Sequence, residues 1–285
     1  MTFASELLQQ LQGAFAGRPR PRITALHLPP QPWSGTKSGE FGAVELASGA
    51  LGLSYVLLDD TLATLADAGT AVVGADALEV AAWWADGEGA RAALGFAAAN
   101  ALSRQLFDEA GFVPPRATDS IGGIDPQPGE HIGMVGFFPP LVKRVTASGA
   151  RLTVLELRAD LAGEHADWRV TLDPRELQTC TQVLSTSTVL LNHSLGEVLA
   201  HCTAAQRVVL IGPSAGGLAD GLFARGVTAI GGMWIEDAAA FKQALSTGAP
   251  WAEATWKFAL GRSDYPGLPA LLERAARRGE AGAEA

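Results

Sequence analysis

Short apolar runs alternate with amphipathic segments over the second half of the chain. The clearest case is His131–Lys143, HIGMVGFFPPLVK, where the apolar run Ile132–Val135 leads through a Gly-Phe-Phe-Pro-Pro turn into a helical pattern. A short apolar run with β-branched residues at its edges is typical of a parallel strand covered on both faces. Gly136 permits a sharp turn, and Pro140 suits the first turn of a helix. The segment therefore predicts a strand–turn–helix unit.

The same pattern recurs downstream. Further strands are predicted over Arg151–Leu157, Gln182–Thr186, Arg207–Ile211 and Val227–Ile230, and helical patterns separate most of them. Strands that alternate with helices at this spacing indicate right-handed crossovers and a mostly parallel sheet. We therefore expect a Rossmann-like α/β domain over residues 131–270.

The first half of the chain follows a different order. Residues 1–17 predict a helix, Arg22–Leu28 alternates as a strand does, and Val44–Leu46 and Leu51–Leu57 predict a hairpin. Alanine-rich helical patterns follow over Asp60–Ala68, Ala77–Ala85 and Gly89–Leu106. This order predicts a small α+β domain over residues 1–115. A stretch dense in Pro, Gly and Asp predicts a linker over residues 116–130, and residues 271–285 are expected to form a helix end and a frayed tail from Gly279.

Composition limits the classes of function. The chain has 285 residues, of which 48% are hydrophobic and 18% charged, so it can bury a sizeable core. A formal net charge of −9, without a large Lys/Arg cluster, argues against nucleic acid or an anionic membrane as a partner. No apolar run is long enough to span a membrane, the amino terminus lacks a signal-peptide pattern, and two cysteines are too few for a disulfide framework. We expect a soluble cytoplasmic protein.

Four turns of the predicted sheet carry the candidate ligand-binding residues. In an open parallel sheet, ligands bind at the carboxyl ends of the strands, near the point where the strand order reverses. The candidates on the four turns are Gly136, Phe137, Pro139, Glu156, Ser185, Thr186, Ser187, Asn192, His193, Gly212, Pro213 and Ser214.

One further candidate lies in the first domain. Asn100 lies on a small-residue helix face and either hydrogen-bonds internally or points into an interdomain cleft.

The turns at Gly136 and Glu156 can be compared with those of a dinucleotide-binding site. Glu156 ends the second strand, where such a site places the acidic residue that binds a ribose. Gly133 and Gly136 do not complete the glycine-rich fingerprint, and the bulky Phe-Phe-Pro-Pro that follows makes a poor pyrophosphate cradle. An ordinary NAD or FAD site is therefore disfavoured. Two interpretations of Glu156 stay open, a ligand contact or a strand-end carboxylate that meets a helix amino terminus.

The richest polar cluster runs from Ser185 to Ser194. Four consecutive hydroxyl residues lead, four positions on, to Asn192 and His193. Hydroxyls beside a helix amino terminus can hold a carboxylate, a phosphate or a chelate group, or can cap backbone groups. Ser194 and Glu197 match a capping box, so we expect Ser194 to cap the next helix. His193 is suited to act as an acid, a base or a metal ligand, with a solvated loop residue as the alternative.

These residues resemble a known family. The resemblance rests on GMVGFFPPLV at 133–142, the strand-end Glu156, the Ser/Thr turn leading to Asn192, VVLIGPSA at 208–215 and the glycines within 226–232. The family is a Rossmann-like family described as heavy-metal chelation proteins, and ARAALGFAAANAL at 90–102 is similar to its enolase-N-terminal-like companion domain. The resemblance implies a ligand site in the cleft between the domains and a role in handling metal ions or metal chelates. His193-Ser194 departs from the family pattern, in which Gly-Thr follows the Asn.

Three functional hypotheses follow. The leading one is a cytoplasmic protein that binds a transition-metal ion or a metal chelate in the cleft, as a handling protein or as an enzyme of metallophore metabolism. Its oxygen donors suit hard or borderline metals or the carboxylates of a chelate, and His193 and Glu156 are the candidate metal ligands. The second is an enzyme that uses a nucleotide or S-adenosyl cofactor, with Glu156 on a ribose. The third is a non-enzymatic homo-oligomer, with a homodimer as the candidate assembly, in which Trp83-Trp84, Trp251 and Trp256 mark the partner surface.

Overall fold

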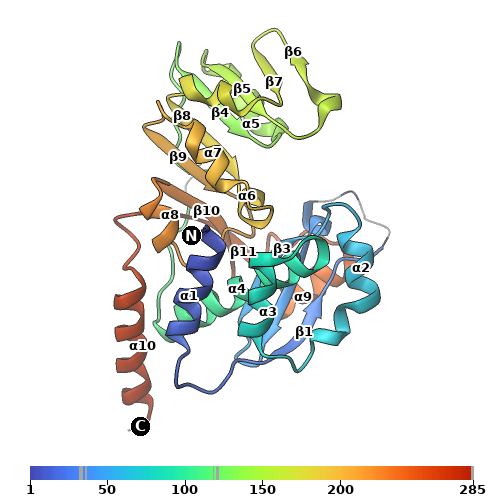
Figure 1. Ribbon diagram of the computed structural model, residues 1–285, viewed down its shortest axis with the longest axis vertical. Coiled ribbons are helices and arrows are strands. Elements are labelled where there is room, and N and C mark those ends of the chain that lie inside the picture. Colours follow the sequence, from blue (N-terminus) through green and yellow to red (C-terminus); the bar gives the residue numbers. More distant parts are fainter. Residues whose placement is uncertain (32–34, 36, 118, 120–121, 284–285) are drawn as a thin grey trace.

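The chain folds around two β-sheets (Figure 1). The computed structural model describes residues 1–31, 35, 37–117, 119 and 122–283, so part of the predicted linker and the last two residues lie outside it. The amino-terminal sheet is antiparallel, in the order β1 (Ile23–His27), β2 (Phe41–Leu46) and β3 (Leu51–Tyr55).

The second sheet has eight strands in the order β11–β10–β9–β8–β4–β5–β7–β6, and all but its two outermost pairs are parallel. These strands are β4 (His131–Val135), β5 (Arg151–Leu155), β6 (Gly163–Glu164), β7 (Trp168–Thr171), β8 (Gln182–Thr186), β9 (Arg207–Ile211), β10 (Ala229–Ile235) and β11 (Thr255–Gly261). From β4 the chain moves outward to β5 and β7, and then returns to β8 on the other side of β4. The strand order therefore reverses between β4 and β8, the place where open parallel sheets bind ligands.

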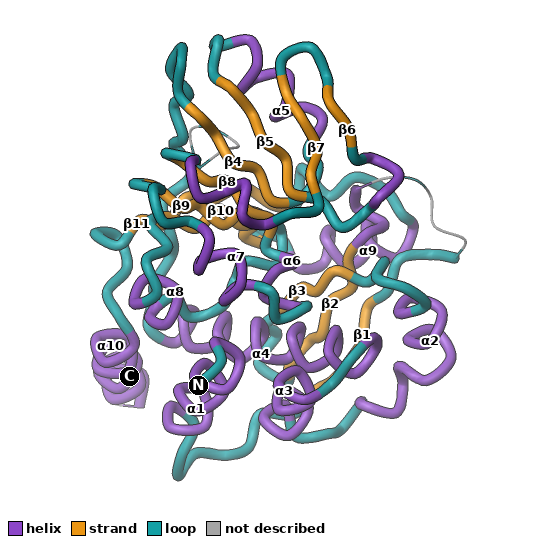
Figure 2. The backbone as a smooth tube through the Cα atoms, turned by 45° about the horizontal axis from the view of Figure 1, so that its top comes forward, coloured by secondary structure: helices purple, strands orange, loops and turns teal. Residues whose placement is uncertain are grey.

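Glycine allows one helix of the first half, α4, to lie directly on β3. The helices are α1 (Phe3–Ala14), α2 (Thr61–Ala68), α3 (Ala77–Asp86) and α4 (Gly89–Glu109), with short 3-10 turns at Lys37–Glu40 and Gly69–Val72. A Cβ at Gly52 of β3 would lie 2.1 Å from the backbone of Ala97 and Ala101 in α4, so only glycine permits this approach. Figure 2 shows α1, α3 and α4 gathered below the large sheet.

The large sheet is covered on both faces. The helices that follow its strands are α5 (Pro139–Ala147), α6 (Thr188–Leu191), α7 (Leu195–His201), α8 (Asp220–Ala224), α9 (Ala238–Thr247) and α10 (Leu268–Ala283), with 3-10 turns at Ala159–Leu161 and Pro174–Thr179. Helix α5 covers one face through Leu141 and Val145. The opposite face shares a core with the amino-terminal helices, which joins Leu7, Trp84 and Phe96 to Val183, Leu190 and Leu218. The two halves of the chain therefore bury one common core.

The predicted fold class is confirmed, a mostly parallel Rossmann-like sheet preceded by a small α+β unit. Strands β6, β7 and β11 were not predicted: β6 is two exposed residues long, β7 mixes polar and apolar residues over four positions, and β11 is an antiparallel edge strand. Strand β10 continues past Ile230 through two glycines, and a Cβ at Gly232 would lie 2.3 Å from the Phe258 ring. Helix α10 continues to Ala283, beyond Gly279, where we expected the chain to fray. Within the described residues, none of the helices combines the length and apolar character needed to cross a membrane.

Candidate functional site

Two of the predicted turns meet where the strand order reverses. Val135 of β4 pairs with Ser185 of β8, so the turns after these parallel strands leave the sheet side by side. Gly136 has a φ of 87°, a left-handed conformation that glycine adopts without steric cost. A Cβ at this position would lie 3.2 Å from Cγ2 of Thr186. The turn after β4 therefore contacts the Thr186 side chain.

Buried hydroxyls join the turns after β8 and β9. Oγ of Ser187 lies 3.1 Å from Oγ of Ser214, and the Ser187 N–H donates to the Ile211 carbonyl over 2.7 Å. A Cβ at Gly212 would lie 2.0 Å from Ser187 Oγ, so glycine is required for this approach. Ser185 is also buried, and its hydroxyl donates to the Thr186 carbonyl over 3.2 Å. These serines hold the turns in position and do not face solvent.

Thr186 and Thr188 are the half-buried hydroxyl residues of this edge. Oγ1 of Thr186 donates to Oγ1 of Thr188 over 3.0 Å and accepts the Thr188 N–H over 3.2 Å. Both side chains are thereby fixed at the start of α6. A ligand at the β4–β8 edge would meet these two hydroxyls and the backbone of Gly136 and Gly212, which are also half-buried.

Glu156 ties the end of β5 to the turn after β4. Its carboxylate accepts the Phe137 N–H over 3.0 Å at one oxygen and the Leu157 N–H over 2.7 Å at the other, which also lies 3.4 Å from the Arg158 nitrogen. One oxygen is thus engaged by a backbone donor just before α5 and the other by backbone donors just after β5. These contacts agree with the second interpretation of Glu156, a strand-end carboxylate that meets a helix amino terminus.

Tyr55 is a residue of this region that the sequence pattern did not indicate. Burial, followed by the negative charges of Glu40 and Glu156, raises the pKa of Tyr55. The end of β3 therefore lies within electrostatic range of the end of β5. The Tyr55 phenol stays protonated at neutral pH. The signal that could have identified it is a tyrosine at the end of the short, largely buried strand Leu51–Tyr55.

Asn192 and His193 form a separate turn after α6. Oδ1 of Asn192 accepts the N–H of Ser194 over 3.2 Å and its hydroxyl over 2.7 Å. The predicted capping box is therefore wrong, because Ser194 is helical at φ −82° and ψ −2° and its side chain bonds backward to Asn192. His193 has a φ of 61°, is exposed, and stacks on Trp84 of α3 with ring centroids 6.0 Å apart.

The two candidate metal ligands have different partners. Glu156 binds backbone amides after β4 and β5, whereas His193 lies against α3. The described residues contain no group of three or more His, Cys, Asp or Glu placed to hold a metal ion. Burial raises the pKa of the Cys180 thiol to about 12 and that of Cys202 to about 11, so both stay protonated at neutral pH and make poor soft-metal ligands.

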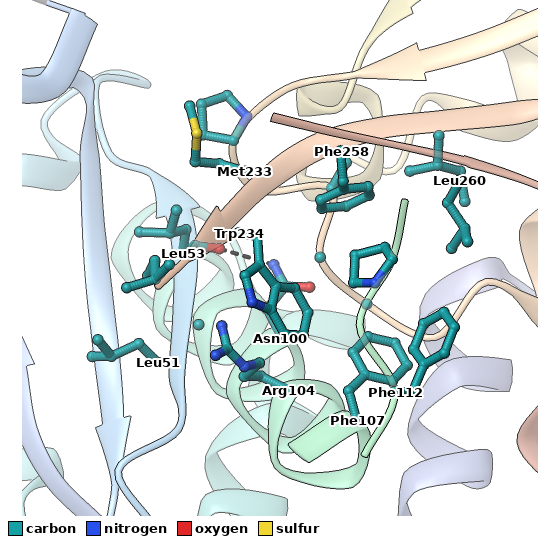
Figure 3. A pocket seen from close by; sticks show the side chains of 18 residues that line it. Leu51, Leu53, Asn100, Arg104, Phe107, Phe112, Met233, Trp234, Phe258 and Leu260 are labelled. Atoms are coloured by element: carbon teal, nitrogen blue, oxygen red, sulfur yellow. Dashed lines mark hydrogen bonds between the residues drawn. The ribbon is translucent and has the colours of Figure 1, made fainter. Parts of the chain in front are cut away.

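Asn100 joins the two halves of the chain. Its Nδ2 donates to the Leu53 carbonyl over 2.8 Å and to the Ser214 carbonyl over 2.9 Å, while its Oδ1 is buried and accepts no hydrogen bond from a described residue. Both alternatives for Asn100 therefore hold, since it bonds internally and also lines a cavity between the sheets (Figure 3). The cavity has a volume of about 40 Å³, room for little more than water.

The remaining candidate residues, Phe137, Pro139 and Pro213, are explained by packing and helix geometry. The Phe137 ring stacks on Trp168, with centroids 5.6 Å apart. Pro139 is exposed at the first position of α5, where a missing N–H costs nothing. Pro213 lines the cavity beside Asn100.

Comparison with known proteins identifies the family. Residues 121–259 match the family model DUF364 and residues 39–103 match DUF4213, both described as "Putative heavy-metal chelation". No curated protein matches. A solved structure of a DUF364-family protein of unknown function from Desulfitobacterium hafniense is similar, with a TM-score of 0.66 and 18% identity, over 91% of this chain and 100% of that one.

A second DUF364-family protein of unknown function, from Pyrococcus horikoshii, has the same TM-score of 0.66 and 18% identity, over 90% of this chain and 99% of that one. At this identity the two structures establish the fold, and the family models cover most of both halves of the chain. The chain therefore belongs to the DUF364 family.

Proposed function

We propose that this protein binds a small metal-chelating molecule, or its metal complex, at the edge formed by the turns after β4, β8 and β9. The family description indicates metal handling, and the proposal adds the ligand class and the place. The metal is cargo in this proposal, held mainly by the oxygens of its chelator.

One observation carries the proposal. The hydroxyls of Thr186 and Thr188 and the backbone of Gly136 lie together at the point where the strand order reverses. The Thr186 hydroxyl and the Gly136 N–H already donate, to Oγ1 of Thr188 and to the Leu155 carbonyl, so among these groups the Thr188 hydroxyl hydrogen is the donor left for a carboxylate oxygen of a chelator. Glu156 acts here as a positioning residue, because its carboxylate holds the Phe137 amide. The nucleotide alternative needs Glu156 to accept from a ribose, yet both its oxygens already accept backbone N–H groups.

The tryptophans that the homo-oligomer hypothesis places on a partner surface give that hypothesis little support. Trp84 is fully buried and Trp251 is 6% exposed, so neither offers a surface to a partner. Trp83 and Trp256 are half-buried, and each lies under an arginine at 4.4 and 4.7 Å from the ring centroid. A docking role for them has no specific observation behind it.

Native mass spectrometry of protein purified without chelators tests the proposal first. We expect a stoichiometric adduct with the mass of a chelator or its metal complex. Isothermal titration with Ni²⁺–citrate, citrate and Ni²⁺ as separate probes then separates chelate from bare-metal binding. Thr188→Val should weaken citrate or chelate binding about tenfold, the usual cost of one hydrogen bond to a charged group. The matched control, Ser246→Ala on α9, removes an exposed hydroxyl and should leave binding unchanged. Binding of Ni²⁺ alone, untouched by Thr188→Val, would contradict the proposal.

A further inference from the structure

A second hollow lies at the opposite edge of the large sheet. It has a volume of about 660 Å³ and is lined by the residues that begin β4, β5 and β7. Sites for small molecules typically measure roughly 300–1,000 Å³. This hollow is separate from the candidate site, which lies at the carboxyl ends of the strands.

Its polar side chains project from one face of the sheet. His131 of β4 pairs with Arg151 of β5, and Thr153 of β5 pairs with Arg169 of β7. Paired residues share a face, as do residues two apart on one strand. The four side chains therefore form one continuous polar group over three neighbouring strands.

The hydrogen bonds within this group leave donors free. Nη2 of Arg151 lies 2.9 Å from Nδ1 of His131, and since a guanidinium can only donate, the ring proton of His131 is on Nε2. That nitrogen lies 2.9 Å from Oγ1 of Thr153, which also accepts from Nε of Arg169 over 3.3 Å. With two bonds accepted, the Thr153 hydroxyl hydrogen is left to donate elsewhere.

The charges of the group are unevenly balanced. Arg169 is paired with Glu176, but no carboxylate of the described residues lies within ion-pair distance of Arg151. Glu164 and Asp167 also line the hollow, but neither carboxylate forms an ion pair with Arg151, and Glu164 of β6 lies beside Arg169 of β7. Among the described residues that line the hollow, Arg151 is therefore a guanidinium without a carboxylate partner.

We propose that this hollow is a second ligand site, in which the Arg151 guanidinium and the Thr153 hydroxyl bind the oxyanion of a small molecule, a phosphate or a carboxylate. His131 is a positioning residue in this site. It is 6% exposed, and by accepting from Arg151 and donating to Thr153 it fixes the spacing of the two donors. Arginine and hydroxyl donors held in place by a buried side chain, here His131, are well suited to bind tetrahedral or planar oxyanions.

Titration calorimetry of the full chain with inorganic phosphate and with acetate, at constant ionic strength, tests the site. We expect saturable binding of at least one anion, and the stronger one identifies the phosphate or the carboxylate class. Arg151→Gln should weaken it by about tenfold or more, as for loss of a charge-assisted hydrogen bond. Arg175→Gln is the matched control, since Arg175 is an exposed arginine paired with Asp173 outside the hollow.

A wild-type measurement keeps the test independent of folding in the variants. Two-dimensional ¹H–¹⁵N spectra recorded during the titration should show shifts concentrated at the Arg151 side chain and at the Thr153 amide. Absence of saturable binding for both anions, or equal losses in Arg151→Gln and Arg175→Gln, would overturn the site. Shifts confined to the turns after β4 and β8 would also overturn it.

Discussion

Ser187 and Ser214 share a buried hydrogen bond of 3.1 Å between their hydroxyl oxygens. They are 27 residues apart and lie on the turns after β8 and β9. The same turns are joined by the Ser187 N–H and by the close approach of Gly212. The edge of the sheet is therefore preorganised by groups that a ligand does not need to touch.

Ser214→Ala should lower the free energy of unfolding by about 1 kcal/mol, the usual net contribution of a hydrogen bond. The measurement is urea unfolding, with a double-mutant cycle against Ser187→Ala. The two substitutions should couple by about 0.5 kcal/mol or more, since each removes the same bond. Fully additive losses would show that the two hydroxyls do not interact.

Asn100→Ala should be more damaging than a typical helix substitution. It removes the donors to the buried carbonyls of Leu53 and Ser214, at about 1–3 kcal/mol for each group left unsatisfied. Gln105→Ala, one turn and a half further along α4, is the control and should cost under about 1 kcal/mol. Equal unfolding midpoints for the two variants would refute the role of Asn100 as a link between the sheets.

Gly52→Ala should disrupt the packing of α4 on β3. The new methyl would lie 2.1 Å from backbone atoms of Ala97 and Ala101, which cannot rotate away, and overpacking of this kind costs about 3 kcal/mol or more. Gly196→Ala in α7 is the matched control, because nothing lies within 4 Å of its Cβ position, and it should stabilise by about 0.5 kcal/mol. Thermal unfolding of both variants checks the prediction, and a Gly52→Ala protein as stable as the wild type would contradict it.

Stability should depend on pH through His131. Burial, and then the positive charges of Arg151 and Arg169, lower the pKa of His131 below its ordinary value of 6.5. The folded state therefore prefers the neutral ring. The contribution of His131 to the free energy of unfolding is full above pH 6.5 and is lost as the pH falls towards the lowered pKa. His131→Gln retains an acceptor for Arg151 and a donor for Thr153 but cannot titrate. Urea unfolding between about pH 8 and pH 5 should show a smaller loss for the variant than for the wild type. Parallel profiles would exclude His131 as the source.

The parallel strands were predictable because their signal is local. Ile132–Val135 is a continuous apolar run bounded by Gly136, and the strand β4 that it forms ends at Val135. Because parallel strands end at one edge, the strand pattern alone is enough to place the turn residues Gly136 and Thr186 together. The same reasoning failed for β7, since Trp168–Thr171 includes polar residues and is recognised as a strand only by its pairing with β5.

The bonding of the candidate residues could not be predicted in the same way. The partners of Asn100 are 47 and 114 residues away, and no local pattern indicates such contacts. Ser194 matched a capping box in sequence, but the left-handed turn at His193 directs its side chain back to Asn192. The hollow at Arg151 was missed because its polar residues come from three strands, each of which carries only one or two of them.

The core that Trp84 and Phe96 share with Leu190 and Leu218 has a consequence for synthesis on the ribosome. The first half of the chain emerges before β8, β9 and α8 have been translated, and domains otherwise tend to fold in the order in which they emerge. The apolar face of α1, α3 and α4 stays uncovered during that interval. The nascent chain therefore presents a binding surface for chaperones that the finished protein no longer has.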